Sequence, residues 1–166
     1  LGRLLITLML INDGVLHSCL FYPSFQFKKN RSEYYRQLTS VRERGTYEEW
    51  IEFFCNSLLE SAKDSVGSLK NLVDLHNRST ATITENLGRT AANGQRLLGI
   101  LEEHPIVDTA FIAAQLDIGR STASSLVKSF EELGILRPLD ESRQRYRQYG
   151  YEEYLSILRE DAEPIR

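Results

Sequence analysis

Apolar residues recur at helical spacing through the first half of the chain. Residues 4–11 are apolar except for Thr7 and are followed shortly by Gly14, a pattern that predicts a buried central helix with a glycine at its end. A second helix is predicted over residues 32–44, where Gly45 ends it.

A third helix is predicted to begin at a capping box, in which Thr46 and Glu49 satisfy free backbone amides. We expect it to continue towards His76 and to be broken by residues 79–82 ahead of a linker. Its apolar face has spacings of three and four residues: Trp50, Phe53, Phe54 and Leu58.

The second half of the chain has a different order of elements. Helices are predicted over residues 95–103, 109–116 and 120–133, the second of them capped by Asp108 or Thr109. A tight turn separates the last two helices, and strands are predicted over residues 135–138 and 143–149. Helix, helix, turn, helix and hairpin is the order of a winged helix-turn-helix domain. Its predicted core is Leu97, Leu98, Leu101, Ile112, Ala113, Leu116, Ile118, Ala123, Leu126, Val127, Phe130 and Leu133.

Composition adds a cellular context to this mainly α fold. The 166 residues carry a net charge of −3 and are 42% hydrophobic, which supports packed cores and excludes wholesale disorder. The apolar run of residues 4–11 is far shorter than the roughly 20 residues of a membrane span, so no membrane partner is expected. Cys19 and Cys55 are far apart, which favours two buried thiols in a reducing, cytoplasmic setting over a disulfide or zinc site.

Duplex DNA is one partner that this pattern predicts. In helix-turn-helix proteins the second helix of the motif enters the major groove. Two sets of residues are candidate DNA contacts: Arg120, Ser121, Thr122, Ser124, Ser125 and Lys128 on that helix, and Arg143, Arg145 and Arg147 at alternate positions of the wing.

The local charge favours a different use of the same fold. Residues 91–166 contain 9 Lys and Arg against 13 Asp and Glu, a balance of −4, whereas dedicated DNA-binding domains are usually basic. A winged helix that contacts protein or forms a homodimer therefore stays open beside the DNA-binding interpretation.

Three blocks of the first half carry a family resemblance. Residues 1–10 (LGRLLITLML) resemble the end of the signature HPFxDGNGRxGR and the helix that follows it in Fic (filamentation induced by cAMP) domain proteins. Residues 20–35 (LFYPSFQFKKNRSEYY) resemble that family's LYLSxYFxxNRxEYY, and residues 41–54 (VRERGTYEEWIEFF) its VREKGDWExWxxFF. The resemblance covers about residues 1–60, and a winged helix after the Fic domain is common in bacterial members.

The resemblance implies two domains and an activity. Residues 1–88 would be the C-terminal helices of a Fic fold with a long connecting helix, and residues 89–166 the winged helix-turn-helix domain. Fic proteins typically transfer AMP from ATP, with Mg²⁺, to a hydroxyl of a target protein. The motif histidine, the metal's acidic ligand and the phosphate-binding loop would all precede Leu1. This chain is therefore expected to be a fragment of such a protein, without catalytic or metal-binding residues and without a cofactor of its own.

The resemblance also assigns three nucleotide-binding residues. Arg3 matches the second arginine of the signature, expected to meet the γ-phosphate of ATP or an inhibitory glutamate. Tyr35 matches the second tyrosine of the YY pair, near the adenine and ribose. Arg42 stands where some relatives have an asparagine that bonds the base. The rivals are a DNA-binding regulator built on a degenerate Fic scaffold and a self-regulating module that only dimerises.

Overall fold

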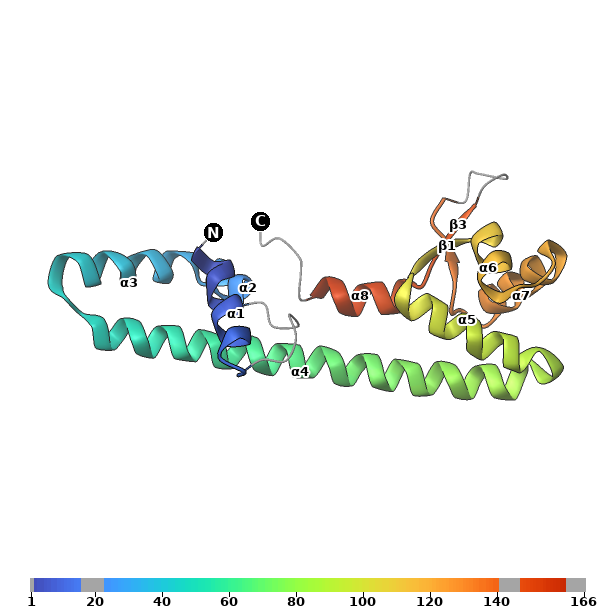
Figure 1. Cartoon of the computed structure of the whole chain (residues 1–166), viewed down its shortest axis with the longest axis horizontal. Helices are drawn as coiled ribbons and strands as arrows, with labels where there is room; N and C mark the ends of the chain where they lie inside the picture. Colours follow the sequence, from blue (N-terminus) through green and yellow to red (C-terminus); the bar gives the residue numbers. More distant parts are fainter. Residues whose placement is uncertain (1, 16–22, 141–146, 161–166) are drawn as a thin grey trace. The chain divides into compact units, whose positions relative to one another are not determined.

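The computed structural model describes residues 2–15, 23–140 and 147–160 (Figure 1). Within these ranges the chain is mainly helical, with eight α-helices, one 3₁₀ turn and a small three-stranded antiparallel sheet. This confirms the predicted class. No helix in the described ranges has the length and apolar character needed to cross a bilayer. The chain divides into two compact units, the first built from Leu1–Lys70 and the second from Asn71–Arg159.

The first unit contains α1 (Gly2–Asn12), α2 (Pro23–Lys29), α3 (Arg31–Arg44) and the beginning of α4 (Tyr47–Asn86). Gly45 ends α3 at φ 68°, a left-handed conformation that glycine adopts without steric cost, and its N–H donates to the carbonyl of Val41. The predicted boundaries of α3 and the start of α4 are confirmed.

An aromatic cluster forms the core of the first unit. Phe27 of α2 is fully buried, and its ring centroid lies 5.4 Å from that of Tyr34 and 5.6 Å from that of Phe54. Trp50 lies 5.6 Å from Tyr34 and also meets Phe53. These distances suit favourable ring pairing, so the predicted apolar face of α4 is where α2 and α3 pack.

Two burial predictions in this unit are wrong. Leu5, Leu8 and Met9 of α1 are each about half exposed, because the helix is apolar on nearly every face and α2 covers only one of them. Cys55 is exposed as well, since it lies on a different face of α4 from the aromatic cluster. Cys19 is outside the described residues.

Helix α4 also corrects the predicted linker, because it runs without interruption to Asn86. Its hydroxyl-bearing residues are accommodated by bonds to carbonyls one turn earlier: Thr82 donates to Arg78 and Thr84 to Thr80. The predicted domain boundary between residues 88 and 89 stays a prediction, and it falls at the 3₁₀ turn η1 (Gly88–Thr90) that follows α4.

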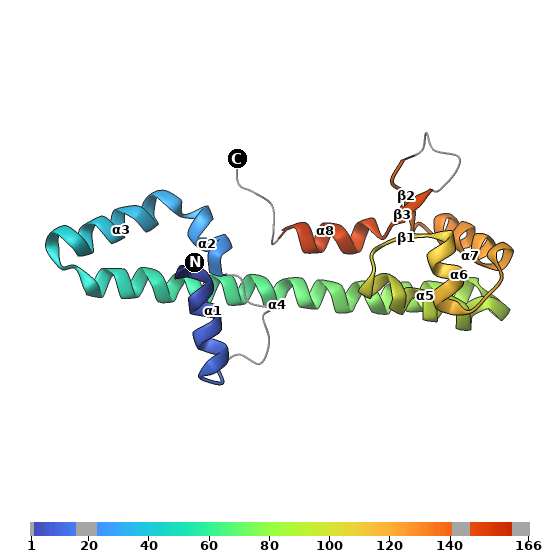
Figure 2. The same ribbon diagram turned by 45° about the horizontal axis from the view of Figure 1, so that its top comes forward.

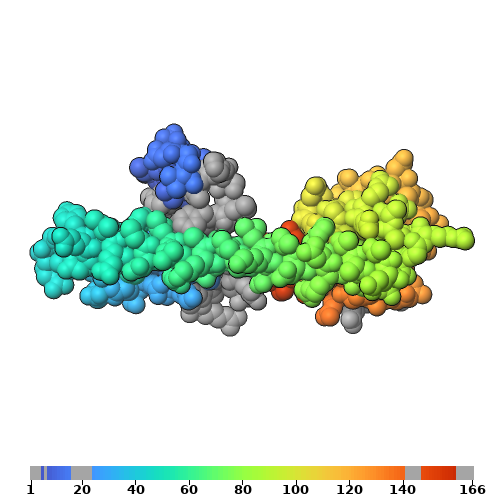
Figure 3. All heavy atoms as spheres, turned by 90° about the horizontal axis from the view of Figure 1, so that it is seen from below, coloured from blue at the N-terminus to red at the C-terminus, as the bar shows by residue number. Residues whose placement is uncertain are grey.

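The second unit continues with α5 (Ala91–Glu103), α6 (Thr109–Leu116), α7 (Arg120–Glu132) and α8 (Glu152–Glu160). Asp108 caps α6 by accepting from the N–H of Phe111 at 2.7 Å. Asp117 follows α6 at φ 54°, and Gly134 follows α7 at φ 74°. The predicted core of this half is buried or partly buried throughout. Figure 3 shows the last turns of α4 next to α5 on one side of this unit.

The sheet is larger than the predicted hairpin. Strand β3 (Gln148–Gly150) lies in the middle, paired antiparallel with β1 (Ile106–Asp108) on one side and β2 (Arg137–Pro138) on the other (Figure 2). The predicted first strand is shorter because the N–H groups of Ile135 and Leu136 both donate to the carbonyl of Phe130 in α7. Most of the predicted second strand lies outside the described residues. Strand β1 and helix α8 were not predicted.

Helix α8 is held to the rest of the second unit by its tyrosines. The hydroxyl of Tyr151, buried just before the helix, is hydrogen-bonded to Ser79 Oγ of α4 at 2.8 Å. Tyr154 donates to the carbonyl of Glu102 at 3.0 Å. The ion pair of Arg78 with Glu153 is exposed and adds little stability.

We expect Gly94→Ala to lower the free energy of unfolding by about 1–3 kcal/mol through overpacking. A Cβ at this position would lie 2.8 Å from Ile83 Cγ2 and from Leu87 Cδ1. Gly99→Ala is the matched control, since nothing lies within 4 Å of its added Cβ, and it should raise stability by up to about 1 kcal/mol. Urea unfolding measures both, and equal effects would contradict the close packing.

A second prediction concerns alkaline pH. Burial raises the pKa of Tyr151 from 10.0 to about 12, against the opposing effect of the Ser79 bond. The folded state thus favours the neutral hydroxyl, and the stability this provides is present below pH 10 and lost as the pH rises towards 12. Urea midpoints measured up to that range should fall more steeply for the native chain than for Tyr151→Phe. Tyr47→Phe, at an exposed position, should follow the native chain, and parallel curves for all three would contradict this role of burial.

Candidate functional site

Tyr35 and Arg42, two of the predicted nucleotide-binding residues, lie on one face of α3. They are about two helical turns apart and both are exposed, Tyr35 with 51% of its surface in solvent. The Arg31 guanidinium lies over the Tyr35 ring, 5.7 Å from its centroid, within cation–π range. This face offers an aromatic ring and two guanidinium groups, which can stack a flat base and attract phosphate oxygens.

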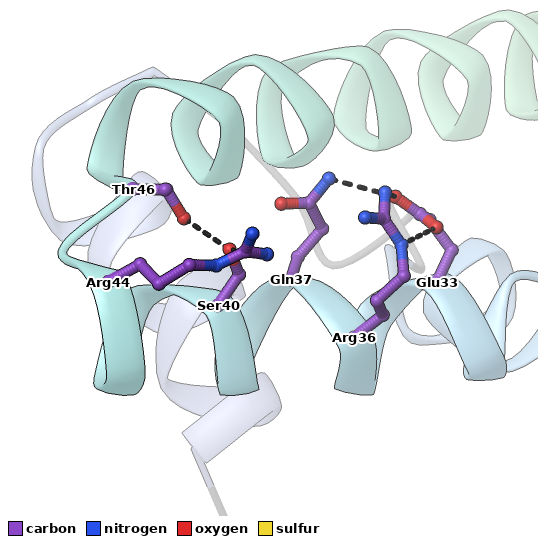
Figure 4. A network of polar contacts seen from close by, with 6 residues as sticks. All are labelled: Glu33, Arg36, Gln37, Ser40, Arg44 and Thr46. Carbon is purple, nitrogen blue, oxygen red and sulfur yellow. Dashed lines mark hydrogen bonds and ion pairs between the residues drawn. The ribbon is translucent and has the colours of Figure 1, made fainter.

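Polar side chains on the other faces of α3 form a hydrogen-bonded network (Figure 4). The Glu33 carboxylate accepts hydrogen bonds from Arg36 Nε and from Gln37 Nε2, each at 2.8 Å. These two hydrogen bonds hold the pKa of Glu33 below its ordinary value, so the carboxyl stays ionised.

The network extends to the start of α4. Ser40 Oγ and Thr46 Oγ1 are 2.7 Å apart, and the Arg44 guanidinium donates to Ser40 at 2.9 Å (Figure 4). Because Ser40 is buried here, α3 is oriented with Tyr35 and Arg42 towards solvent.

Arg3 is the third predicted nucleotide-binding residue. Its backbone belongs to α1, but its side chain is outside the described residues. Tyr34, the neighbour of Tyr35, is half-buried in the aromatic cluster and serves the core.

All six candidate residues of α7 are exposed, as predicted: Arg120, Ser121, Thr122, Ser124, Ser125 and Lys128. The opposite face of α7 packs into the core. The structure nevertheless divides this set. Thr122 and Ser125 line a small cavity of about 80 Å³ with Thr90 and Asn93, whereas Lys128 lies 3.8 Å from Glu132 in an exposed ion pair.

Arg120 and Ser124 belong to a second, larger pocket of about 470 Å³. It lies where α6 and α7 begin and where the chain enters β3, and the arginine of the wing, Arg147, lines it too. The remaining lining residues are Asp108, Thr109, Ala110 and Tyr149. Arg143 and Arg145, the other two wing candidates, are outside the described residues.

Two guanidinium groups, of Arg120 and Arg147, and one carboxylate, of Asp108, line the pocket. Two helices begin at it, α6 at Thr109 and α7 at Arg120, and their N-terminal amides carry partial positive charge. Arg147 already has an interaction partner, and its guanidinium carries five N–H donors. The Asp108 carboxylate is the acidic group of the lining, and it is bonded to the N–H of Phe111 as the helix cap.

Sequence reasoning missed Thr109 and Tyr149 as pocket residues. Tyr149 follows Arg147 by two positions, and strand alternation places such residues on one face, so this signal could have found it. Thr109 is brought to the pocket by the pairing of β1 with β3, for which the sequence offered no local signal.

The described residues contain no group of three His, Cys, Asp or Glu side chains that could hold a metal ion. No model of a known protein family matches the sequence.

Proposed function

We propose that this chain is the C-terminal part of a Fic-family AMP transferase, with the last helices of a Fic fold followed by a winged helix-turn-helix domain. One observation carries the proposal. Phe27 and Tyr34 of the second resembling block pack against Phe54 and Trp50 of the third, respectively. Two blocks that resemble one family in sequence thus form one core.

In this proposal the exposed face of α3 holds the nucleotide. The Tyr35 ring stacks on the adenine and Arg42 bonds its edge or the ribose, while Arg3 meets the γ-phosphate. The hydroxyl oxygen of the target protein attacks the α-phosphorus, the bond to the β-phosphate breaks, and pyrophosphate leaves. The hydroxyl proton would pass to the motif histidine that the resemblance implies, and Mg²⁺ would offset phosphate charge beside it.

The second unit supports the winged-helix part of the proposal. Its helices α5, α6 and α7, followed by strands β2 and β3, occur in the predicted order, and the unpredicted strand β1 lies between α5 and α6 in the sequence. The exposed polar face of α7 is the surface that such a domain presents to a partner.

The test uses the full gene product with Mg²⁺ and ATP labelled on the α-phosphate. We expect covalent label on the protein itself or on lysate proteins. Because base stacking on an aromatic ring is worth about 1–3 kcal/mol, Tyr35→Ala should raise the KM for ATP by roughly tenfold. Tyr35→Phe should retain most of the activity.

Tyr47→Ala is the matched control, since Tyr47 is 63% exposed in the same unit and outside the proposed site. Absence of label, even after replacement of any inhibitory glutamate, would refute the transferase. Label that is insensitive to Tyr35→Ala would place the nucleotide elsewhere.

A DNA-binding regulator is the second candidate, favoured by the six exposed polar side chains of α7. It predicts a gel shift with duplex DNA that weakens steeply from low to physiological salt. Lys128→Gln should weaken binding and reduce the salt dependence by about one unit of slope. Arg96→Gln, an exposed position on α5, is the control of equal charge change. No shift at low salt would exclude this candidate.

A further inference from the structure

The pocket at the starts of α6 and α7 has the composition of an anion site. Arg120 and Arg147 come from separate elements and line the same cavity. A guanidinium offers a planar fork of donors that matches phosphate oxygens. Arg147 already has a partner, but a guanidinium has five N–H donors, so both arginines can still contact oxygens of one phosphate group.

Other donors of the lining fit the same ligand. Thr109 and Ser124 contribute hydroxyl groups, and the first residues of α6 and of α7, Thr109 and Arg120, both belong to the lining. The carboxylate of Asp108 is bonded to the N–H of Phe111, which reduces its repulsion of an anion.

Size and charge favour a small ligand over a duplex. The volume of about 470 Å³ lies in the range of small-molecule sites. Residues 91–166 have a charge of −4, so their overall field repels a long polyanion. Positive charge concentrated in a cavity of an acidic domain is suited to one phosphate group.

We propose that this pocket binds the phosphate group of a small phosphorylated molecule of about mononucleotide size. The site is independent of AMP transfer, which the proposed function assigns to the first unit. A DNA backbone presents the same chemistry, and the test separates the two sources.

Inorganic phosphate, AMP and a short duplex are titrated separately into the full chain at constant ionic strength, with binding followed by calorimetry. We expect phosphate and AMP to bind. Because the proposed function places a second adenine-nucleotide site on α3, the variants are compared with inorganic phosphate, and Arg120→Gln and Arg147→Gln should each weaken phosphate binding at least tenfold. Arg96→Gln removes the same charge from an exposed position of α5 outside the pocket and should leave binding unchanged.

Ser124→Asp keeps the test decisive if an arginine variant fails to fold. It places a carboxylate in the pocket and should abolish phosphate binding, whereas Ser121→Asp, exposed on the same helix outside the pocket lining, should retain it. Binding of the duplex alone would overturn the small-molecule source. Failure of phosphate and AMP to bind, or binding equally strong in all variants, would overturn the site.

Discussion

Because Gly94 has no Cβ, the backbone of α5 lies very close to the side chains of Ile83 and Leu87. A Cβ added at this position would be too close to both of them. This close approach presents the apolar face of α5 to the other helices of the second unit. Leu97, Leu98 and Leu101 on that face are essentially fully buried. Phe130 of α7 lies 3.6 Å from the same added Cβ, so the absence of a side chain at Gly94 sets how closely α5 packs against both the end of α4 and α7.

Much of this fold could be predicted, because its helices are bounded by local signals. Gly45 and Gly134 adopt positive φ and end their helices where the sequence indicated. The continuation of α4 could not be predicted in the same way. Ser79 interrupts the apolar pattern when only its neighbours are considered, yet it lies on the buried face because Tyr151, far along the chain, supplies its hydrogen-bond partner. Helix propensity is a local property of each residue and carries no information about such a distant contact.

The candidate sites show the same division between local and distant information. Exposure of the α7 residues followed from helical periodicity and was predicted correctly. Their grouping into pockets could not be predicted from periodicity. Arg120 and Arg147 line one pocket because of the turn after α6 and the pairing of β1 with β3. On α3, periodicity placed Tyr35 and Arg42 on one face, and the buried contact of Ser40 with Thr46 turns that face to solvent.

The contribution of α4 to the second core determines where the chain can be divided. Leu75, Ser79 and Ile83 are buried in that core, although they precede the 3₁₀ turn at which a boundary was predicted. An expression fragment that starts at this turn would leave Tyr151 without its hydroxyl partner and would expose the apolar face of α5. A fragment that starts within α4, at residue 71, keeps both. The practical start of this domain is therefore inside a helix.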